Sequence, residues 1–491
     1  RQDVEHGAAC INAMELFTKG ELQEADAPVS KRTHVVADEQ RLHVLVVVLG
    51  SRGDVVSVVP ICQELEAEGH SVLVASTRNF RRAVEIFNVK FTSLGDAESD
   101  DITESQGSSS SSGKWMVPEP SWNAYDVLPE VLPALVSLTS RNDFNVILAN
   151  NAAAECAMRV ASVRPELSFL RIERSPASSL PGTPYMLYGS TPRTRLEDLQ
   201  LWAGQILLKS SARKDFEKAI CGVQGADTSS SMEVAAKVAK APVVHAWSKQ
   251  VFMSDTGEET GLVLLGKYHG WVAPEAILDA FMSKRDAQGR RPVVITFGDH
   301  RLASESLEVA LAEQLADMGW LVLIQASREA TDGTMSFGLG PKKGSRMKPV
   351  HSQLKDRTGM MKASYYVPHE WLFPRCSIVV CHGGAGTVQR ALWAGAPCVV
   401  CPQVSAEHRH IGEMLQNNKL GAVLEGQQPT TQEMQAAMQT AFRCRKYAHE
   451  LCAELGKENG AAVAVRKITR LLAENKEPSN VVRSACCGCR S

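Results

Sequence analysis

The sequence predicts an α/β protein with two domains, each built on a parallel sheet. Three observations predict this class. A strand, a glycine turn and a helix follow one another from residue 41, and the same succession returns over residues 379–402. The chain also has 491 residues, more than one hydrophobic core usually organises. We therefore expect one sheet near each end of the chain.

The first of these units reads RLHVLVVVLGSRGDVVSVVPICQELEAEGHSVLVAS. A strand over residues 43–49 precedes a glycine turn at residues 50–54, and apolar residues near helical spacing follow. A second strand at residues 72–75 completes a βαβ unit, which implies a parallel sheet. Further short apolar runs predict strands at residues 89–94, 144–149, 167–172, 292–297, 320–324, 378–381 and 397–400.

The domain boundaries follow from changes in composition. Residues 1–40 are polar and weakly patterned, which indicates an N-terminal extension. We assign residues 41–250 to the first domain and 251–475 to the second. The stretch 96–113 contains five consecutive serines and is expected to be a mobile loop. Residues 476–491 form a tail with Cys486, Cys487 and Cys489, for which acylation and metal binding are alternatives to disorder.

Composition and charge exclude several classes. The net charge of −2 supplies no broad basic field for nucleic acid. Runs of eighteen or more apolar residues are absent from the sequence, so we expect no membrane span, and the first residues lack the plan of a signal peptide. The 13 cysteines are mostly scattered singly, which favours a reducing, cytoplasmic location. Cys398 and Cys401 flank two valines, a pattern that favours strand core over a metal site.

The segment VVCHGGAGTVQRALWAGAPCVVCP predicts an anion site. Gly383, Gly384 and Gly386 allow a tight turn after a buried strand, and Thr387 is expected to cap the following helix. The unpaired N–H groups and the positive end of the helix dipole then converge where a phosphate fits, with His382 beside them as a donor. A tight strand-to-helix connection without a ligand is the alternative.

The text that leads into this turn, YYVPHEWLFPRCSIVVCHGGAGT, resembles the nucleotide-sugar-binding block of the family 1 glycosyltransferases. The version is that of sterol 3-beta-glucosyltransferases and of their bacterial glycopeptide-modifying relatives. The Gly-Ser-Arg-Gly-Asp turn followed by Pro60 looks like the first loop of the same enzymes. The resemblance implies a GT-B fold, with two Rossmann-like domains facing across a cleft and a terminal helix that returns to the first domain.

The resemblance also implies an activity. A hexose, with glucose expected, would move from a UDP-sugar to a hydroxyl of a lipophilic acceptor such as a sterol, with inversion at the anomeric carbon. The acceptor would lie in the first domain and the UDP-sugar in the second. No metal and no further cofactor are implied, and peripheral contact with a membrane is compatible with such an acceptor. The acceptor and the sugar themselves are left open.

The resemblance assigns site residues by position. Asp54 would be the catalytic base, next to an acceptor loop of Ser51, Arg52 and Gly53. An alternative for Asp54 is to cap a helix that begins at Val55. The implied donor-binding residues are Gly298, Val367, His382, Gly384, Ala385, Gly386, Thr387, Glu407 and His408. His369 and Trp371, in the same block, are better explained by core packing.

Three departures from the family pattern leave a second interpretation open. Asp299 stands where a serine near the phosphates is usual, and Glu407 with His408 replaces an Asp-Gln pair that holds the sugar hydroxyls. The connection over residues 328–362 is longer and more polar than usual, as in a surface loop or a partner site. A catalytically degenerate protein that binds a nucleotide or a partner is therefore the alternative. A dinucleotide-dependent oxidoreductase fits less well, because the first turn lacks GxGxxG.

Overall fold

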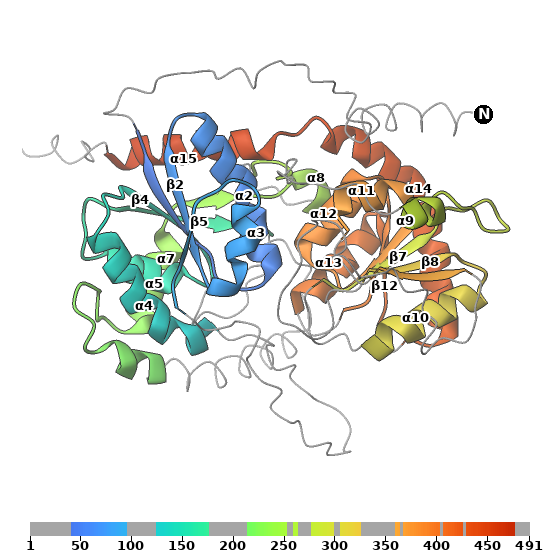
Figure 1. The fold of residues 1–491 in the computed structure, drawn as a ribbon, viewed down its shortest axis with the longest axis horizontal. Helices are drawn as coiled ribbons and strands as arrows, with labels where there is room; N and C mark the ends of the chain where they lie inside the picture. Colours follow the sequence, from blue (N-terminus) through green and yellow to red (C-terminus); the bar gives the residue numbers. More distant parts are fainter. Residues whose placement is uncertain are drawn as a thin grey trace, which may run out of the picture.

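The computed structural model describes residues 41–95, 124–175, 214–252, 259–263, 276–298, 305–325, 359–363, 367–402, 406–425 and 429–476. Two six-stranded sheets lie side by side, each covered by helices (Figure 1). All the strand pairs are parallel. The two-domain α/β class predicted from the sequence is confirmed.

The first sheet has the strand order β3-β2-β1-β4-β5-β6. Its central strand β1 (His43–Val47) is fully buried after its first residue, because helices cover both faces. Val44 and Val46 face one core, whereas Leu45 and Val47 face the other. The remaining strands are β2 (Ser71–Ser76), β3 (Phe91–Ser93), β4 (Val146–Asn150), β5 (Ser168–Glu173) and β6 (Val243–His245).

The second sheet repeats this plan with the order β12-β11-β10-β7-β8-β9. Its central strands are apolar on both faces for the same reason. Cys398 and Cys401, predicted to be core residues, are fully buried among them. The strands are β7 (Val293–Thr296), β8 (Val322–Gln325), β9 (Met360–Ala363), β10 (Ile378–Cys381), β11 (Cys398–Val400) and β12 (Gly421–Val423).

The helices pack on both faces of each sheet. Those that precede the second sheet are α2 (Arg52–Ala67), η2 (Arg78–Phe80), α3 (Arg81–Glu85), α4 (Ala124–Ser140), α5 (Ala154–Ala161), α7 (Ser231–Lys240), α8 (Lys249–Phe252) and α9 (Ala276–Met282). Those that follow β7 are α10 (Glu305–Asp317), α11 (His369–Leu372), η3 (Phe373–Arg375), α12 (Ala385–Trp393), α13 (Ala406–Asn417), α14 (Thr431–Leu455) and α15 (Gly460–Lys476). Every helix in the described part of the chain is too short or too polar to cross a bilayer.

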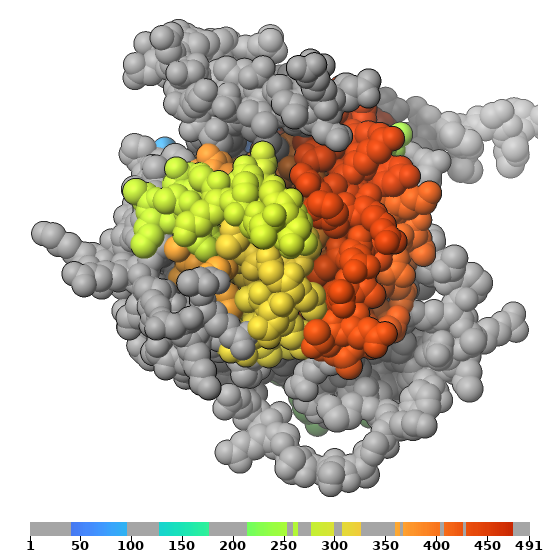
Figure 2. All heavy atoms as spheres, turned by 90° about the vertical axis from the view of Figure 1, so that its right-hand side faces the viewer, coloured from blue at the N-terminus to red at the C-terminus, as the bar shows by residue number. Residues whose placement is uncertain are grey.

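The last two helices connect the domains. α14 lies on the second domain beside α10, on the face that Figure 2 presents. α15 leaves that domain and lies along the first one (Figure 1), where Val465 and Ile468 join the core formed by β1 and α2. The last helix, α15, which ends the range assigned to the second domain, therefore packs on the first domain. The resemblance implies this arrangement.

Several sequence predictions need correction or fall outside the described residues. β6, β9 and β12 were not predicted. β9 begins within the connection over residues 328–362, for which a surface loop or a partner site was expected, and it pairs along its whole length with β8. The N-terminal extension, the serine-rich loop, residues 328–358 and the cysteine-rich tail are outside the described residues, as is Asp299.

Candidate active site

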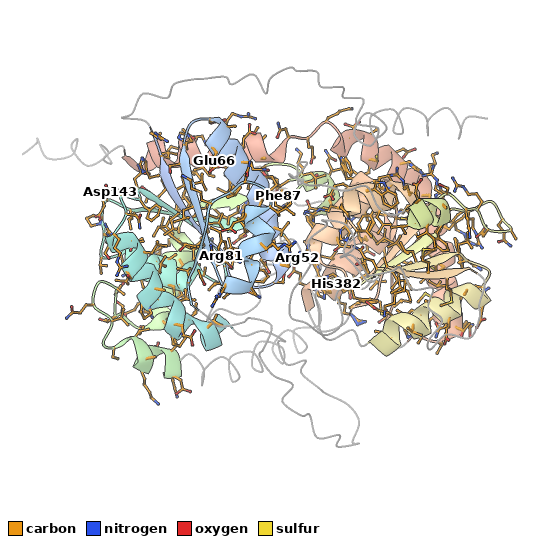
Figure 3. The ribbon with its side chains drawn as sticks, in the orientation of Figure 1. Arg52, Glu66, Arg81, Phe87, Asp143 and His382 are labelled. Carbon is orange, nitrogen blue, oxygen red and sulfur yellow. The ribbon has the colours of Figure 1, made fainter. Side chains whose placement is uncertain are left out.

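The candidate site residues lie where the two sheets face each other. In both sheets the carboxyl ends of the parallel strands lead to the predicted turns, the position where open α/β sheets bind ligands. Figure 3 labels Arg52, at the start of α2, and His382, after β10, on facing sides of the boundary between the domains. Burial, Arg390 and Arg52 lower the pKa of His369 well below its usual range, so Arg52 of the first domain lies close to α11 of the second.

The loop after β1 is held together by Asp54. Ser51 donates from its backbone N–H to Asp54 Oδ2 at 2.8 Å, and from its hydroxyl to the same oxygen at 2.7 Å. Gly50 has φ +123°, and a Cβ there would lie 2.7 Å from that oxygen, so the position requires glycine. The helix begins at Arg52 and not at Val55, so Asp54 lies in its first turn and supports the N-cap residue from there.

Arg174 holds the other oxygen of Asp54. Its Nε lies 2.7 Å from Oδ1, and the residue follows directly after β5. Burial opposes the charge of Arg174, but Asp54 and Glu407 outweigh this effect and raise the pKa of the guanidinium. The candidate base is therefore paired with a cation that also lies near a carboxylate of the second domain.

Glu407 connects the second domain to the same strand end. Ser175, buried and next to Arg174, donates its hydroxyl to Glu407 Oε1 at 2.7 Å. Burial raises the pKa of Glu407 and Asp54 adds to this, whereas Arg174 and the Ser175 hydrogen bond oppose it. Glu407 lies in the first turn of α13, so the two domains meet at a polar contact.

The loop after β10 is shaped by close approaches that exclude side chains. Gly383 has φ +98°, and a Cβ there would lie 2.8 Å from the carbonyl oxygen of His408. A Cβ on Gly384 would lie 2.3 Å from His382 Nε2, and one on Gly298 would lie 3.3 Å from His382 Cε1. The imidazole of His382 therefore lies against two glycines, one from each of the turns that follow β7 and β10.

The helix that follows this turn begins at Ala385, with Gly384 as its N-cap residue. Thr387 lies in the first turn, so the prediction that Thr387 caps the helix is wrong. Side-chain capping and acidic residues are both absent from this described helix start. The first N–H groups of a helix have no partner within it, so those of Ala385, Gly386 and Thr387 face the turn with the positive end of the dipole.

Two histidines and a glutamine complete the second half of the site. The rings of His382 and His408 are 4.7 Å apart between centroids and nearly perpendicular, at 81°. Gln325, at the end of β8, donates Nε2 to the Val367 carbonyl at 2.7 Å. Its Oε1 is buried without a hydrogen-bond partner among the described residues. Val367, one of the implied donor-binding residues, therefore already accepts one hydrogen bond at its carbonyl.

The neighbouring segment, residues 369–373, has a structural role. Trp371 is buried in a hydrophobic core of the second domain. The ring of His369 stacks on that of Phe373, with ring centroids 4.3 Å apart. Glu370 receives an ion pair from Arg390 at 2.9 Å, which ties α11 to α12. The prediction of packing for His369 and Trp371 agrees with these contacts.

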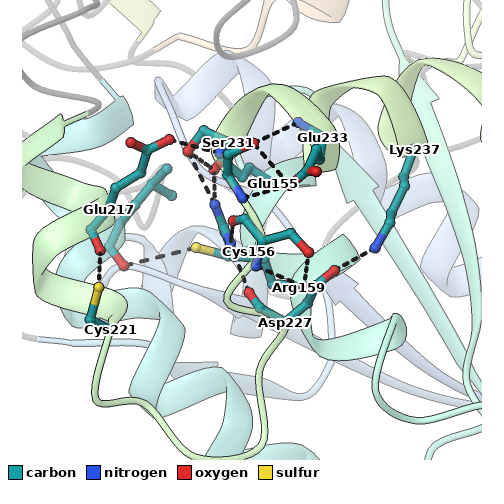
Figure 4. A network of polar contacts seen from close by, with 12 residues as sticks. Glu155, Cys156, Arg159, Glu217, Cys221, Asp227, Ser231, Glu233 and Lys237 are labelled. Carbon is teal, nitrogen blue, oxygen red and sulfur yellow. Dashed lines mark hydrogen bonds and ion pairs between the residues drawn. The ribbon is translucent and has the colours of Figure 1, made fainter.

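A second polar network lies inside the first domain, apart from the candidate site residues. Figure 4 shows Arg159, fully buried, bonded to Glu155 at 2.8 Å and to the carbonyls of Asp227 and Ser229 at 2.7 and 2.8 Å. Ser231 also donates to Glu155, at 2.6 Å. These bonds attach the loop before α7 to α5 and involve none of the predicted site residues.

The structure thus brings together the residues predicted for each loop and adds three that were not predicted. Asp54, Ser51 and Gly53 share the loop after β1. His382 and Gly384 share the loop after β10, and Gly298, from the turn after β7, lies against His382. Arg174, Ser175 and Gln325 were missed. The one available signal was that Arg174 and Gln325 each follow or end an apolar strand run in the sequence, at the carboxyl edge of a sheet.

The comparisons with known proteins concern the fold and the sequence family that the chain resembles. Residues 337–464 match the family model described as the glycosyltransferase family 28 C-terminal domain. A sterol 3-beta-glucosyltransferase from Arabidopsis thaliana is 24% identical over 379 residues, which cover 74% of this chain and 54% of that protein. Vancomycin aglycone glucosyltransferase from Amycolatopsis orientalis is 33% identical over 111 residues, or 22% of this chain and 27% of that protein. The chain spans about half the length of the plant relative.

Solved structures show the same fold. The glycosyltransferase of kitacinnamycin has a TM-score of 0.58 at 17% identity, covering 88% of this chain and 99% of that one. Spinosyn rhamnosyltransferase SpnG, complexed with thymidine diphosphate, has a TM-score of 0.53 at 16% identity, covering 87% and 100%.

The fold therefore defines a protein of the GT-B class. More particularly, residues 337–464 are similar to a glycosyltransferase family 28 C-terminal domain, and the chain is similar at low identity to sterol 3-beta-glucosyltransferases and, over a shorter stretch, to a glycopeptide glycosyltransferase. The resemblance found in the sequence is confirmed.

Proposed function

We propose that the protein is a nucleotide-sugar-dependent glycosyltransferase. It transfers a hexose, with glucose expected, from a UDP-sugar to a hydroxyl of a lipophilic acceptor such as a sterol. The observation that carries the proposal is the placement of the loop with Arg52 and the carboxylate of Asp54 opposite a glycine turn at His382, whose helix start has no side-chain cap among the described residues. The choice of acceptor and sugar is supported by the sterol glucosyltransferases among the relatives.

The reaction needs a base on one side and an anion site on the other. The acceptor oxygen forms a bond to the anomeric carbon from the face opposite the diphosphate, which inverts that carbon. The bond between the anomeric carbon and the diphosphate oxygen breaks, and its electron pair leaves with UDP. The acceptor proton passes to Asp54, a role that requires the hydroxyl to lie within hydrogen-bond reach of the carboxylate.

The contacts of Asp54 limit where that proton arrives. A carboxylate oxygen has two lone pairs, and both on Oδ2 are used by Ser51. Oδ1 accepts from Arg174 and keeps one lone pair. We therefore assign Oδ1 as the oxygen that receives the proton.

The leaving diphosphate would lie at the start of α12. The N–H groups of Ala385, Gly386 and Thr387 point at the turn, and the helix dipole favours negative charge there. His382 adds a side-chain donor at the same place. Because these groups are already oriented, they stabilise the charge without rearranging during the reaction.

The sugar would be held by Glu407 and His408, the pair that replaces Asp and Gln. Glu407 accepts a hydrogen bond from Ser175, and a carboxylate is the kind of acceptor that a sugar hydroxyl requires. Restoring the usual pair, with Glu407→Asp and His408→Gln together, should leave UDP affinity unchanged and alter which UDP-sugar is used.

The deciding experiment incubates the purified protein with UDP-glucose, UDP-galactose, UDP-N-acetylglucosamine and dTDP-glucose, with and without a sterol. We expect slow nucleotide release without acceptor, faster release with a sterol, and a sterol glycoside detected by mass spectrometry. A protein that binds UDP by calorimetry but transfers no sugar from any donor would contradict the proposal.

That outcome would favour the second candidate, a GT-B protein that binds a nucleotide without transfer. Its supporting observation is that Glu407, at the sugar position, is already bonded to Ser175. Recovery of transfer when Glu407 and His408 are replaced by Asp and Gln, in an otherwise inert protein, would establish it.

A further inference from the structure

We propose that Arg174 is a positioning residue that aligns the catalytic base Asp54 with the sugar held by the second domain. The proposal rests on the function proposed above. It concerns a residue that follows β5 and is distant in sequence from both glycine turns.

The first step is the orientation of the base. Ser51 holds Oδ2 of Asp54 from the side of α2, and Arg174 Nε holds Oδ1 at 2.7 Å from the side of β5. Two anchors on different elements prevent rotation of the carboxylate, so the remaining lone pair of Oδ1 keeps one direction. A Cβ on Gly53 would lie 3.5 Å from Arg174 Nη1, so the guanidinium lies over the acceptor loop.

The second step is the position of the guanidinium between two carboxylates. Asp54 belongs to the first domain and Glu407 to the second, and both act electrostatically on Arg174. A cation there favours the ionised form of both groups. Without it, two carboxylates would face each other at the place where the acceptor meets the sugar, and each would favour protonation of the other.

The third step is the contact made by the next residue. The Ser175 hydroxyl donates to Glu407 Oε1 at 2.7 Å, and Ser175 is 2% exposed. Two consecutive residues after β5 thus hold one carboxylate from each domain. Their spacing along the backbone is constant, so the base and the sugar-binding residue take a defined separation when the domains are in contact.

A merely structural ion pair is the competing explanation. Partly exposed pairs of this kind contribute little to stability, and a purely structural pair would leave turnover unchanged. Arg164 offers a matched control, because its Nε donates to Glu166 at 2.6 Å with a side chain 27% exposed, compared with 32% for Arg174. Arg164 precedes β5 and so lies near the amino end of that strand, whereas Arg174 follows its carboxyl end.

The test is a double-mutant cycle on sugar transfer with UDP-glucose and a sterol. We expect Arg174→Met to lower kcat tenfold or more, Arg174→Lys to recover part of the loss, and Arg164→Met to change kcat less than twofold. UDP Kd, measured by calorimetry, should stay within twofold in all three variants, which also shows that they fold. In an Asp54→Asn background, Arg174→Met should change kcat less than twofold, because its effect acts through Asp54.

Two results would overturn the inference while leaving the proposed function intact: wild-type kcat in Arg174→Met, or a full tenfold loss in the Asp54→Asn background. Wild-type transfer by Asp54→Asn alone would instead remove the base assignment and the inference together.

Discussion

The turns after β1 and β10 have the same local plan, a buried parallel strand followed by glycines and a helix, but their helix N-termini differ. The first turn holds its own anion, because Asp54 accepts from Ser51 and pairs with Arg174. The second has glycine as its N-cap residue and no acidic residue in the first turn of α12. A helix start that already contains a carboxylate repels a phosphate, whereas one without it attracts a phosphate.

This difference assigns opposite tasks to two similar motifs. A carboxylate held at the first turn is available to remove a proton, and open N–H groups at the second are available to bind a diphosphate. Neither glycine pattern distinguishes these tasks, since the distinction depends on which side chain occupies the helix start. The predictions below test this contrast, beginning with the largest expected effect.

Asp54→Asn should lower the turnover of sugar transfer by about a hundredfold or more, because the amide cannot accept the acceptor proton. UDP affinity should not change, since we propose that the nucleotide binds at the other turn. Steady-state kinetics and calorimetry measure the two quantities. Ser51→Ala is the control, because it removes one hydrogen bond to Asp54 and leaves the carboxylate. Equal turnover in Asp54→Asn, with stability lowered by about 1 kcal/mol, would assign Asp54 to helix capping alone.

Gly384→Ala should abolish most UDP binding, because the added Cβ would lie 2.3 Å from His382 Nε2 and displace the imidazole. The backbone at Gly384 suits alanine, with φ −62°, so the clash is the only source of strain in this substitution among the described contacts. Gly53→Ala is the matched control in the first turn. Its Cβ would meet its nearest atoms at 3.5 Å, an ordinary contact. Equal UDP affinity of the two variants, measured by calorimetry, would contradict the proposal that only the turn after β10 binds UDP.

His382→Ala should weaken UDP by about 1 to 3 kcal/mol, the range for losing a hydrogen bond to a charged group. His43→Ala, an exposed histidine at the opposite end of β1, should leave UDP affinity unchanged. The comparison is made by titration calorimetry on variants with equal melting temperatures. Unchanged affinity in His382→Ala would place the diphosphate elsewhere.

Glu407 should make a small, pH-dependent contribution to stability. Burial raises its pKa above 4.5 in the folded protein, so the folded state holds the proton more tightly than the unfolded chain. The free energy of unfolding should therefore fall as pH rises from below 4.5 through the raised pKa. Glu407→Gln lacks this titration, so the variant should gain stability relative to the wild type over that range. Urea denaturation at a series of pH values would contradict this prediction if the two curves stayed parallel.

The strands that were predicted most accurately from the sequence are those whose two faces are both buried. Strands at the centre of each sheet were predicted within about two residues, because both of their faces are apolar. The three strands that were missed, β6, β9 and β12, are all at sheet edges, and each is only partly buried. A strand of three or four residues with a solvated side leaves too short an apolar run to recognise.

The site was predicted in two halves and not as a whole. The glycine turns, Asp54 and His382 could be found from residue order, since a turn and the start of a helix are local structures set by neighbouring residues. Even there the helix starts were misplaced, because the N-cap residues are Ser51 and Gly384 rather than Asp54 and Thr387.

The contacts of Arg174 and Ser175 required the folded chain. They join strand β5 to Asp54 in one direction and to Glu407 in the other, and the three segments are remote from one another in the sequence. An arginine after an apolar strand has no periodicity that reveals its partner. Its role depends on which strands are neighbours in the sheet and on how the second domain faces the first. The order and spacing of residues determine the local turns by themselves. The pairing of charges across the two domains is determined by long-range packing.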